Sequence, residues 1–169
     1  MSGQIITCYS YKGGVGRTMA MANMAVLMAL RGRRVLCVDW DLEAPGLHLY
    51  FKGEKARVGP GSTGLLDLVE ALALDSGASW EAHVRPVKLA APGKLDLLCA
   101  GVEDKDYVPR LQKLNWEQLY TENGIGEAIE RLRREWTERY DVVLVDSRTG
   151  ISDIGGICTI QIPDILVMF

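Results

Sequence analysis

Short apolar runs alternate with longer segments of helical pattern along most of the chain. The runs are rich in Val, Ile, Leu, Cys and Tyr and predict β-strands, and the segments between them are rich in good helix formers. The runs that end at Asp39 and Asp146 are apolar at nearly every position, which is typical of a sheet covered on both faces. This order of elements predicts an α/β fold with a mostly parallel sheet and helices on both faces. Strands are expected at residues 4–9, 34–39, 95–99, 141–146 and 165–169, and helices at 17–30, 63–74 and 124–140.

The clearest helical pattern lies at residues 124–140. Its apolar residues recur at the spacing of one helix face, so this face is predicted to pack on the sheet. Residues 75–91 contain Gly, Ser, Pro and Trp without a clear period, and no element is predicted there. The residues of the apolar face are Ile125, Ala128, Ile129, Leu132 and Trp136.

Composition narrows the possible classes of protein. The chain has 169 residues, of which 48% are hydrophobic, so one folded domain over residues 1–169 is expected. A net charge of −3 argues against nucleic-acid binding by charge alone, and the sequence gives no evidence for a nucleic-acid or membrane partner. The longest apolar stretch, residues 19–30, is shorter than the roughly 20 residues of a bilayer span. No basic segment followed by an apolar block opens the chain, so no secretory signal is expected.

The four cysteines are widely spaced and form no C-x-x-C pair. Cys8, Cys37 and Cys99 lie within predicted strands, where cysteine behaves as a small apolar residue. Buried free thiols are therefore expected in place of disulfides or a metal site. This favours a reducing compartment, and we expect a cytoplasmic protein.

A glycine-rich loop, K-G-G-V-G-R-T at residues 12–18, connects the first predicted strand to the first predicted helix. Glycines let backbone N–H groups converge on an anion, and the start of a helix adds unpaired donors. The hydroxyl of Thr18 follows the basic residue, where it could bind Mg²⁺. The pattern G-x-x-x-x-G-K-[ST] fails at Tyr11 and Arg17. Because such turns also serve tight packing, the loop alone leaves nucleotide binding open.

Two further segments place carboxylates where strands end. Asp39 ends the second predicted strand, Asp41 follows it, and Asp146 ends a later strand before S-R-T-G. In open α/β sheets, ligands bind outside the carboxyl ends of the strands, so these segments and the glycine loop are expected to meet in one crevice. Each aspartate alone could be a helix cap or a turn residue. Together they indicate a site for Mg²⁺ and a phosphate ligand.

These motifs together resemble the MinD/ParA family of deviant Walker-A ATPases. The resemblance implies a P-loop NTPase fold, ATP and Mg²⁺ as cofactors, and a homodimer that forms around nucleotide. It implies that Lys12 reaches the phosphates held by the partner subunit, that Arg17 neutralises phosphates in its own subunit and that Asp41 orients the attacking water. Thr18 and Asp146 match the Mg²⁺ ligands, and Asp41 is a further candidate for the metal. The implied nucleotide contacts are Lys12, Gly13, Gly14, Val15, Gly16, Arg17, Thr18 and Met19.

The chain departs from the family pattern at several positions. Arg17 stands where the family usually has lysine, and Met19 stands where it usually has a second threonine. Arg148 and Thr149 occupy positions where proline is common. Arginine is a planar fork and lysine a compact charge, so nucleotide binding is expected with slow hydrolysis, at a rate that the sequence leaves open. The family's fold continues past residues 165–169, so the sequence resembles the N-terminal portion of a longer ATPase, C-terminally incomplete, with unidentified partners or fused domains.

Three alternatives remain open to the leading prediction of a Mg²⁺-dependent ATPase switch. The first is a nucleotide-binding scaffold or sensor with little or no hydrolysis. The second is a bacterial tyrosine kinase, which the resemblance associates with a C-terminal tyrosine cluster, whereas the last tyrosine here is Tyr140. The third is a structural α/β domain that binds no nucleotide.

Overall fold

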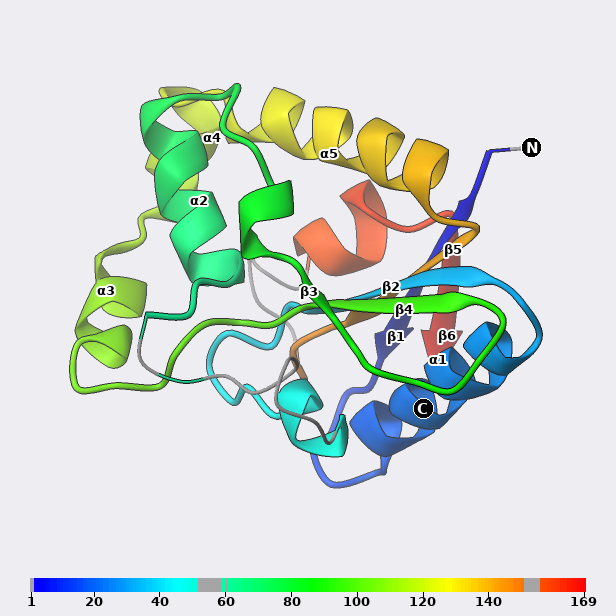
Figure 1. Cartoon of the computed structure of the whole chain (residues 1–169). Coiled ribbons are helices and arrows are strands. Elements are labelled where there is room, and N and C mark those ends of the chain that lie inside the picture. The colour runs from blue at the N-terminus through cyan, green and yellow to red at the C-terminus, as the bar shows by residue number, and fades with distance from the viewer. Residues whose placement is uncertain (1, 52–58, 60, 151–155) are drawn as a thin grey trace.

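The computed structural model describes residues 2–51, 59, 61–150 and 156–169, and a six-stranded sheet forms its centre (Figure 1). The strand order is β3-β4-β2-β5-β1-β6, in which β3 pairs antiparallel to β4 and the other neighbours are parallel. The predicted mostly parallel α/β sheet is confirmed. The strands are β1 (Gln4–Tyr9), β2 (Arg34–Asp39), β3 (Arg85–Pro86), β4 (Lys94–Leu98), β5 (Val142–Asp146) and β6 (Ile165–Met168).

Helices cover both faces of the sheet, as the continuous apolar strands indicate. In β2, Val35 and Cys37 belong to the core under α1 (Arg17–Leu30), whereas Leu36 and Val38 belong to the core on the opposite face. Successive side chains of a strand point to opposite faces, so both sets must be apolar when both faces are covered. The second core is closed by α2 (Leu65–Leu74) and α5 (Ile125–Arg139), which lie across the sheet from α1 (Figure 1).

Several short elements have no periodic signature in the sequence. Within the unassigned residues 75–91, Trp80 is buried, packs edge-on against Trp136 with ring centroids 6.3 Å apart, and donates from Nε1 to Glu135 at 2.7 Å. One anchored side chain therefore fixes a segment that lacks a repeating pattern. The unpredicted elements are η1 (Leu47–Tyr50), η2 (Glu81–His83), β3, α3 (Tyr107–Lys113), α4 (Trp116–Thr121) and a π-helical turn, η3 (Ile157–Gln161).

The four cysteines are free and buried, and burial was predicted for Cys8, Cys37 and Cys99. Burial is the main cause that raises the pKa of Cys8 to about 11, so this thiol stays protonated and unreactive near neutral pH. In the part of the chain that the structure describes, no helix has the length and apolar character needed to span a bilayer.

The strand order brings distant loops together. Strand β5 lies between β1 and β2, and the Cα atom of Asp146 is paired in register with both Cys8 and Asp39. The loops that follow β1, β2 and β5 therefore leave the sheet at the same edge. This edge carries the residues that the sequence singled out.

Candidate functional site

The glycine loop adopts a backbone that requires glycine. Gly14 has φ +76° and Gly16 has φ +84°, a left-handed conformation that other residues adopt at a cost. A Cβ atom at Gly13 or Gly14 would meet no atom within 4 Å, so space lies open beside the backbone. Helix α1 begins at Arg17 with no acidic side chain in its first turn. The loop and the helix start thus present an uncapped, electropositive backbone suited to an anion.

A cleft of about 410 Å³ lies against this loop. A larger cleft of about 590 Å³ between α4 and η3 is lined mainly by apolar side chains such as Trp116 and Ile160. The smaller cleft is the better candidate for a site because backbone donors and buried charges converge there. It is lined by Ser10, Gly13, Gly14, Val15, Gly16, Arg17, Thr18, Met19, Asp41, Ala44, Tyr50 and Thr149.

Arg17 points into the protein, toward the carboxylates at the ends of β2 and β5. Its Nε donates to Asp146 Oδ1 at 2.5 Å, its Nη2 to Asp41 Oδ2 at 3.2 Å and its Nη1 to Ser10 Oγ at 3.1 Å. The side chain is only 6% exposed. One guanidinium therefore joins three separate loops of the site.

Negative charge exceeds positive charge around Arg17. Asp39, Asp41 and Asp146 are all buried, and each has a pKa raised chiefly by burial. The charge of Arg17 opposes this rise at Asp41 and Asp146, and the neighbouring Asp146 adds to it at Asp39, whose pKa reaches about 7. Such a surplus of buried carboxylate charge is suited to a further cation.

Asp39 is the carboxylate most completely enclosed. Its Oδ2 accepts from the backbone N–H groups of Gly46 and Leu47 at 3.2 and 3.1 Å, and so holds the loop that follows β2. Its Oδ1 is buried and accepts no hydrogen bond from any residue that the structure describes. An orphaned carboxylate oxygen at this place fits a site that an added cation or water would complete.

The side chains present suit Mg²⁺ better than a metal ion whose ligands all come from the protein. Thr18 hydrogen-bonds the Asp146 carboxylate, so the two expected Mg²⁺ ligands lie side by side. Among the described residues, no group of three His, Cys, Asp or Glu side chains forms a ready metal cage. Mg²⁺ usually takes one or two carboxylates and completes its shell with water and phosphate oxygens. Thr18, Asp146 and Asp41 match this requirement.

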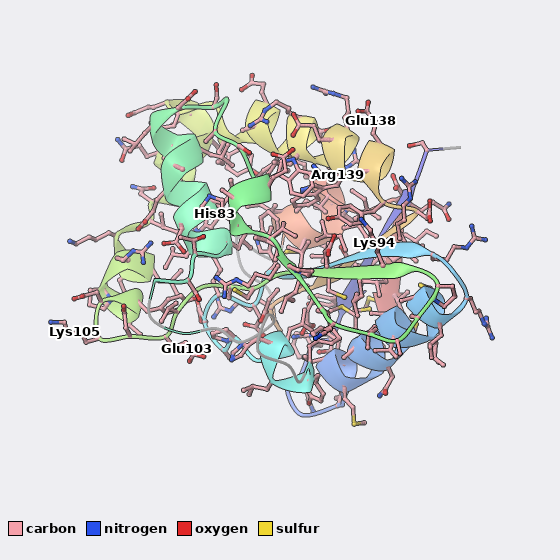
Figure 2. All side chains as sticks on the ribbon, viewed as in Figure 1. His83, Lys94, Glu103, Lys105, Glu138 and Arg139 are labelled. Atoms are coloured by element: carbon pink, nitrogen blue, oxygen red, sulfur yellow. The ribbon has the colours of Figure 1, made fainter. Side chains whose placement is uncertain are left out.

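Lys12 is the first residue of the glycine loop and does not line the cleft around Arg17. Its side chain is exposed, and the ion pairs of the described chain do not include it. Val15 and Met19 are about half exposed at 48% and 52%. Lys12 thus differs from the buried charges of the site and resembles, in exposure, surface residues such as Lys105 and Glu138, which extend outward in Figure 2.

The sequence reasoning missed several residues that shape the site. Ser10 is buried and accepts from Arg17, and Asp39, which the sequence indicated as a strand-end carboxylate, also holds the loop after β2, a role that was not predicted. Arg148 pairs with Glu43 at 2.5 Å and links the loops after β5 and β2. No local pattern could have indicated this pair, because it depends on two strands lying side by side.

A comparison of the sequence with protein families matches residues 6–159 to the CobQ/CobB/MinD/ParA nucleotide binding domain. A putative replication protein A of Rhizobium rhizogenes is 31% identical over 150 residues, which cover 85% of this chain and 34% of that protein. The septum site-determining protein MinD of Bacillus subtilis is 26% identical over 150 residues, or 88% of this chain and 46% of that protein. The chain thus spans between about a third and about half of these relatives.

The fold agrees with this match. The structure is similar to that of the septum site-determining protein MinD of Pyrococcus horikoshii in complex with Mg-ADP, with a TM-score of 0.69 and 25% identity. The similarity covers 98% of this chain and 57% of that one. The family match extends over most of the chain and includes the glycine loop and the three buried aspartates. The chain therefore belongs to the CobQ/CobB/MinD/ParA family of nucleotide binding domains.

Proposed function

We propose that the protein is a Mg²⁺-dependent switch that binds and hydrolyses ATP and dimerises around the nucleotide. The observation that carries the proposal is the meeting of an uncapped glycine loop with three buried carboxylates, two of which, Asp41 and Asp146, share the guanidinium of Arg17. The loop suits phosphate groups, and the surplus of carboxylate charge suits Mg²⁺. Burial of Asp41 and Asp146 beside this cleft costs free energy that binding of a cation would offset.

The residues of the site divide into distinct roles under this proposal. The backbone of residues 13–18 would bind phosphate oxygens, and Thr18 with Asp146 would hold Mg²⁺, which supplies positive charge for the phosphoryl group. Asp41 lines the cleft and would orient water or, as a further candidate, contact the metal. Lys12 is exposed outside its own cleft, so it is free to reach the nucleotide of a second subunit.

A sensor or scaffold with little turnover is the second candidate. Arg17 stands where a phosphate-binding lysine is usual, and its guanidinium is engaged by Asp41 and Asp146. A planar guanidinium held by two carboxylates is less free to move toward a phosphate than the ammonium group of a flexible lysine. Nucleotide binding without appreciable hydrolysis would follow if Arg17 cannot reach the transferred phosphoryl group.

Calorimetry of the full-length protein with ATP, ADP and GTP in the presence of Mg²⁺ tests nucleotide binding. We expect binding of ATP and ADP, and absence of binding by a folded protein would refute both candidate functions. Phosphate release then separates the ATPase from the low-turnover sensor.

Light scattering with ATP and with ADP tests the dimer. Asp41→Ala is expected to keep ATP bound and to accumulate as a dimer, whereas Lys12→Ala should bind ATP as a monomer and lose turnover. The loss in turnover should correspond to about 2–4 kcal/mol, as for other positioned donors. Lys105→Ala, which removes an exposed lysine from the loop before α3, is the control. Native protein and Asp41→Ala that both stay monomeric with ATP would refute the role of Lys12 across the interface.

A further inference from the structure

Arg17 holds the place at which a metal ion would be expected. Its three nitrogen atoms contact Asp146, Asp41 and Ser10, and two of these partners carry the negative charge of the cleft. Ion pairs with both carboxylates leave the guanidinium 6% exposed. The same side chain lines the cleft beside the glycine loop, together with Asp41, so it lies next to the space open to phosphate.

Phosphate binding and carboxylate pairing compete for this one guanidinium. If Arg17 turned to the phosphates of a nucleotide, Asp41 and Asp146 would remain buried without a positive partner. A buried charge that loses its partner is strongly destabilising. Conversely, Mg²⁺ that entered without nucleotide would meet carboxylates already paired with Arg17 and would be repelled by the charge of its guanidinium.

We propose that Arg17 is an exchangeable counter-ion that makes Mg²⁺ and nucleotide depend on each other for binding. Nucleotide draws Arg17 toward the glycine loop, and Mg²⁺ replaces it at Asp41 and Asp146. Bound nucleotide removes the guanidinium that opposes Mg²⁺, and bound Mg²⁺ pairs with the carboxylates that Arg17 leaves. Each ligand therefore increases the affinity for the other, and by linkage the two increases are equal. The inference rests on the proposed nucleotide site and assigns to Arg17 a role in its regulation.

The geometry accounts for the use of arginine. The acceptors Asp146 Oδ1, Asp41 Oδ2 and Ser10 Oγ are each reached by a different nitrogen of the same planar group. A lysine ammonium is a compact group that offers its donors from a single atom. Arg17→Lys is therefore expected to neutralise the two carboxylates less completely and to weaken the competition with Mg²⁺.

The test compares full-length native protein with Arg17→Met, Arg17→Lys and the control Arg34→Met. Arg34 pairs with Asp141 at 2.7 Å far from the cleft and is 48% exposed, so it gives the same chemical change at a surface site. Two quantities are measured for each protein. The first is the shift in melting temperature caused by Mg²⁺ alone, and the second is the ratio of ADP dissociation constants without and with Mg²⁺.

For native protein and Arg34→Met, we expect almost no shift with Mg²⁺ alone and an ADP ratio of about 10 or more, within the usual range of coupling. For Arg17→Met, Mg²⁺ alone should raise the melting temperature by several degrees, and the ADP ratio should fall clearly below the native value, to the part supplied by direct contact between Mg²⁺ and phosphate oxygens. Arg17→Lys should lie between these limits.

The inference is overturned if Arg17→Met responds to Mg²⁺ as native protein does, or if it keeps the native ADP ratio. If Arg17→Met folds only when Mg²⁺ is present, the exchange is supported directly. If it folds in neither buffer, Arg17→Lys decides by the same two quantities, and native-like values overturn the inference. Failure of native protein to bind ADP at all would refute the proposed nucleotide function, which is a different outcome from ADP binding with no Mg²⁺ coupling.

Discussion

Asp39→Asn is expected to change how the stability of the protein depends on pH. Burial, with the charge of Asp146, raises the pKa of Asp39 from its usual 3.8 to about 7. Between these values the folded protein retains a proton that the unfolded chain releases, so stability falls as the pH rises from about 4 to about 7. Above pH 7 both states are ionised and the folded state bears the whole penalty.

The size of this effect follows from the same pKa. A gap of about three pKa units corresponds to about 4 kcal/mol, and relaxation of the loop after β2 reduces it toward about 2 kcal/mol. Asparagine keeps the oxygen that accepts from Gly46 and Leu47 but carries no charge. The unfolding free energy of Asp39→Asn, relative to that of native protein, should therefore increase by about 2–4 kcal/mol as the pH rises from about 4.5 to about 8. This range begins just above the usual pKa and ends above the raised one.

Urea unfolding of both proteins at several pH values measures this difference. Asp104→Asn, on the exposed loop before α3, makes the same chemical change at the surface and should show a pH dependence like that of native protein. A stability difference between Asp39→Asn and native protein that stays constant within about 1 kcal/mol over this range would contradict the reasoning.

Three other substitutions test separate parts of the structure. Asp146→Asn should keep the fold and weaken Mg²⁺-dependent ADP binding, measured by calorimetry, because the amide loses the charge that attracts the metal; unchanged Mg²⁺ dependence would make Asp146 a turn residue. Gly14→Ala should cost about 1–2 kcal/mol of unfolding free energy because Gly14 has φ +76°, whereas Gly13→Ala, with a usual φ, should cost much less; equal urea midpoints for the two variants would contradict the strain. Trp136→Ala should lower the unfolding free energy measured in urea by about 3–5 kcal/mol, because it removes a fully buried ring packed on Trp80. A decrease below about 1 kcal/mol would contradict this, because it would mean that neighbouring side chains fill the cavity.

The strands and long helices could be predicted from local pattern. The apolar runs at β1, β2 and β5 and the stripe on α5 were predicted within a residue or two of their observed bounds, because burial on a face imposes a period that the sequence must carry. The glycine loop was equally visible, since only glycine tolerates the left-handed backbone at Gly14 and Gly16. The sequence by itself thus determined the elements and the chemical types of residue at the sheet edge.

The short elements are held by contacts that leave no periodic pattern in the sequence. Helix α3 is held by Tyr107, whose hydroxyl donates to the carbonyl of Leu42 at 2.9 Å, and by Arg110, which pairs with Asp67 and Glu70 on α2. These partners are far apart in the sequence, so no window of residues around α3 reveals them. Packing across loops overrides weak local preference in such segments.

The charge balance of the site was decided by tertiary structure alone. The sequence predicted that Arg17 contacts the phosphates. In the structure, β5 lies between β1 and β2, and this strand order brings Asp146 and Asp41 within reach of the Arg17 guanidinium. The partners lie 129 and 24 residues away along the chain, so only the assembled sheet determines the field that orients this side chain. Buried charges pair with whatever opposite charge the fold brings near, because an unpaired charge is too costly in a low-dielectric interior.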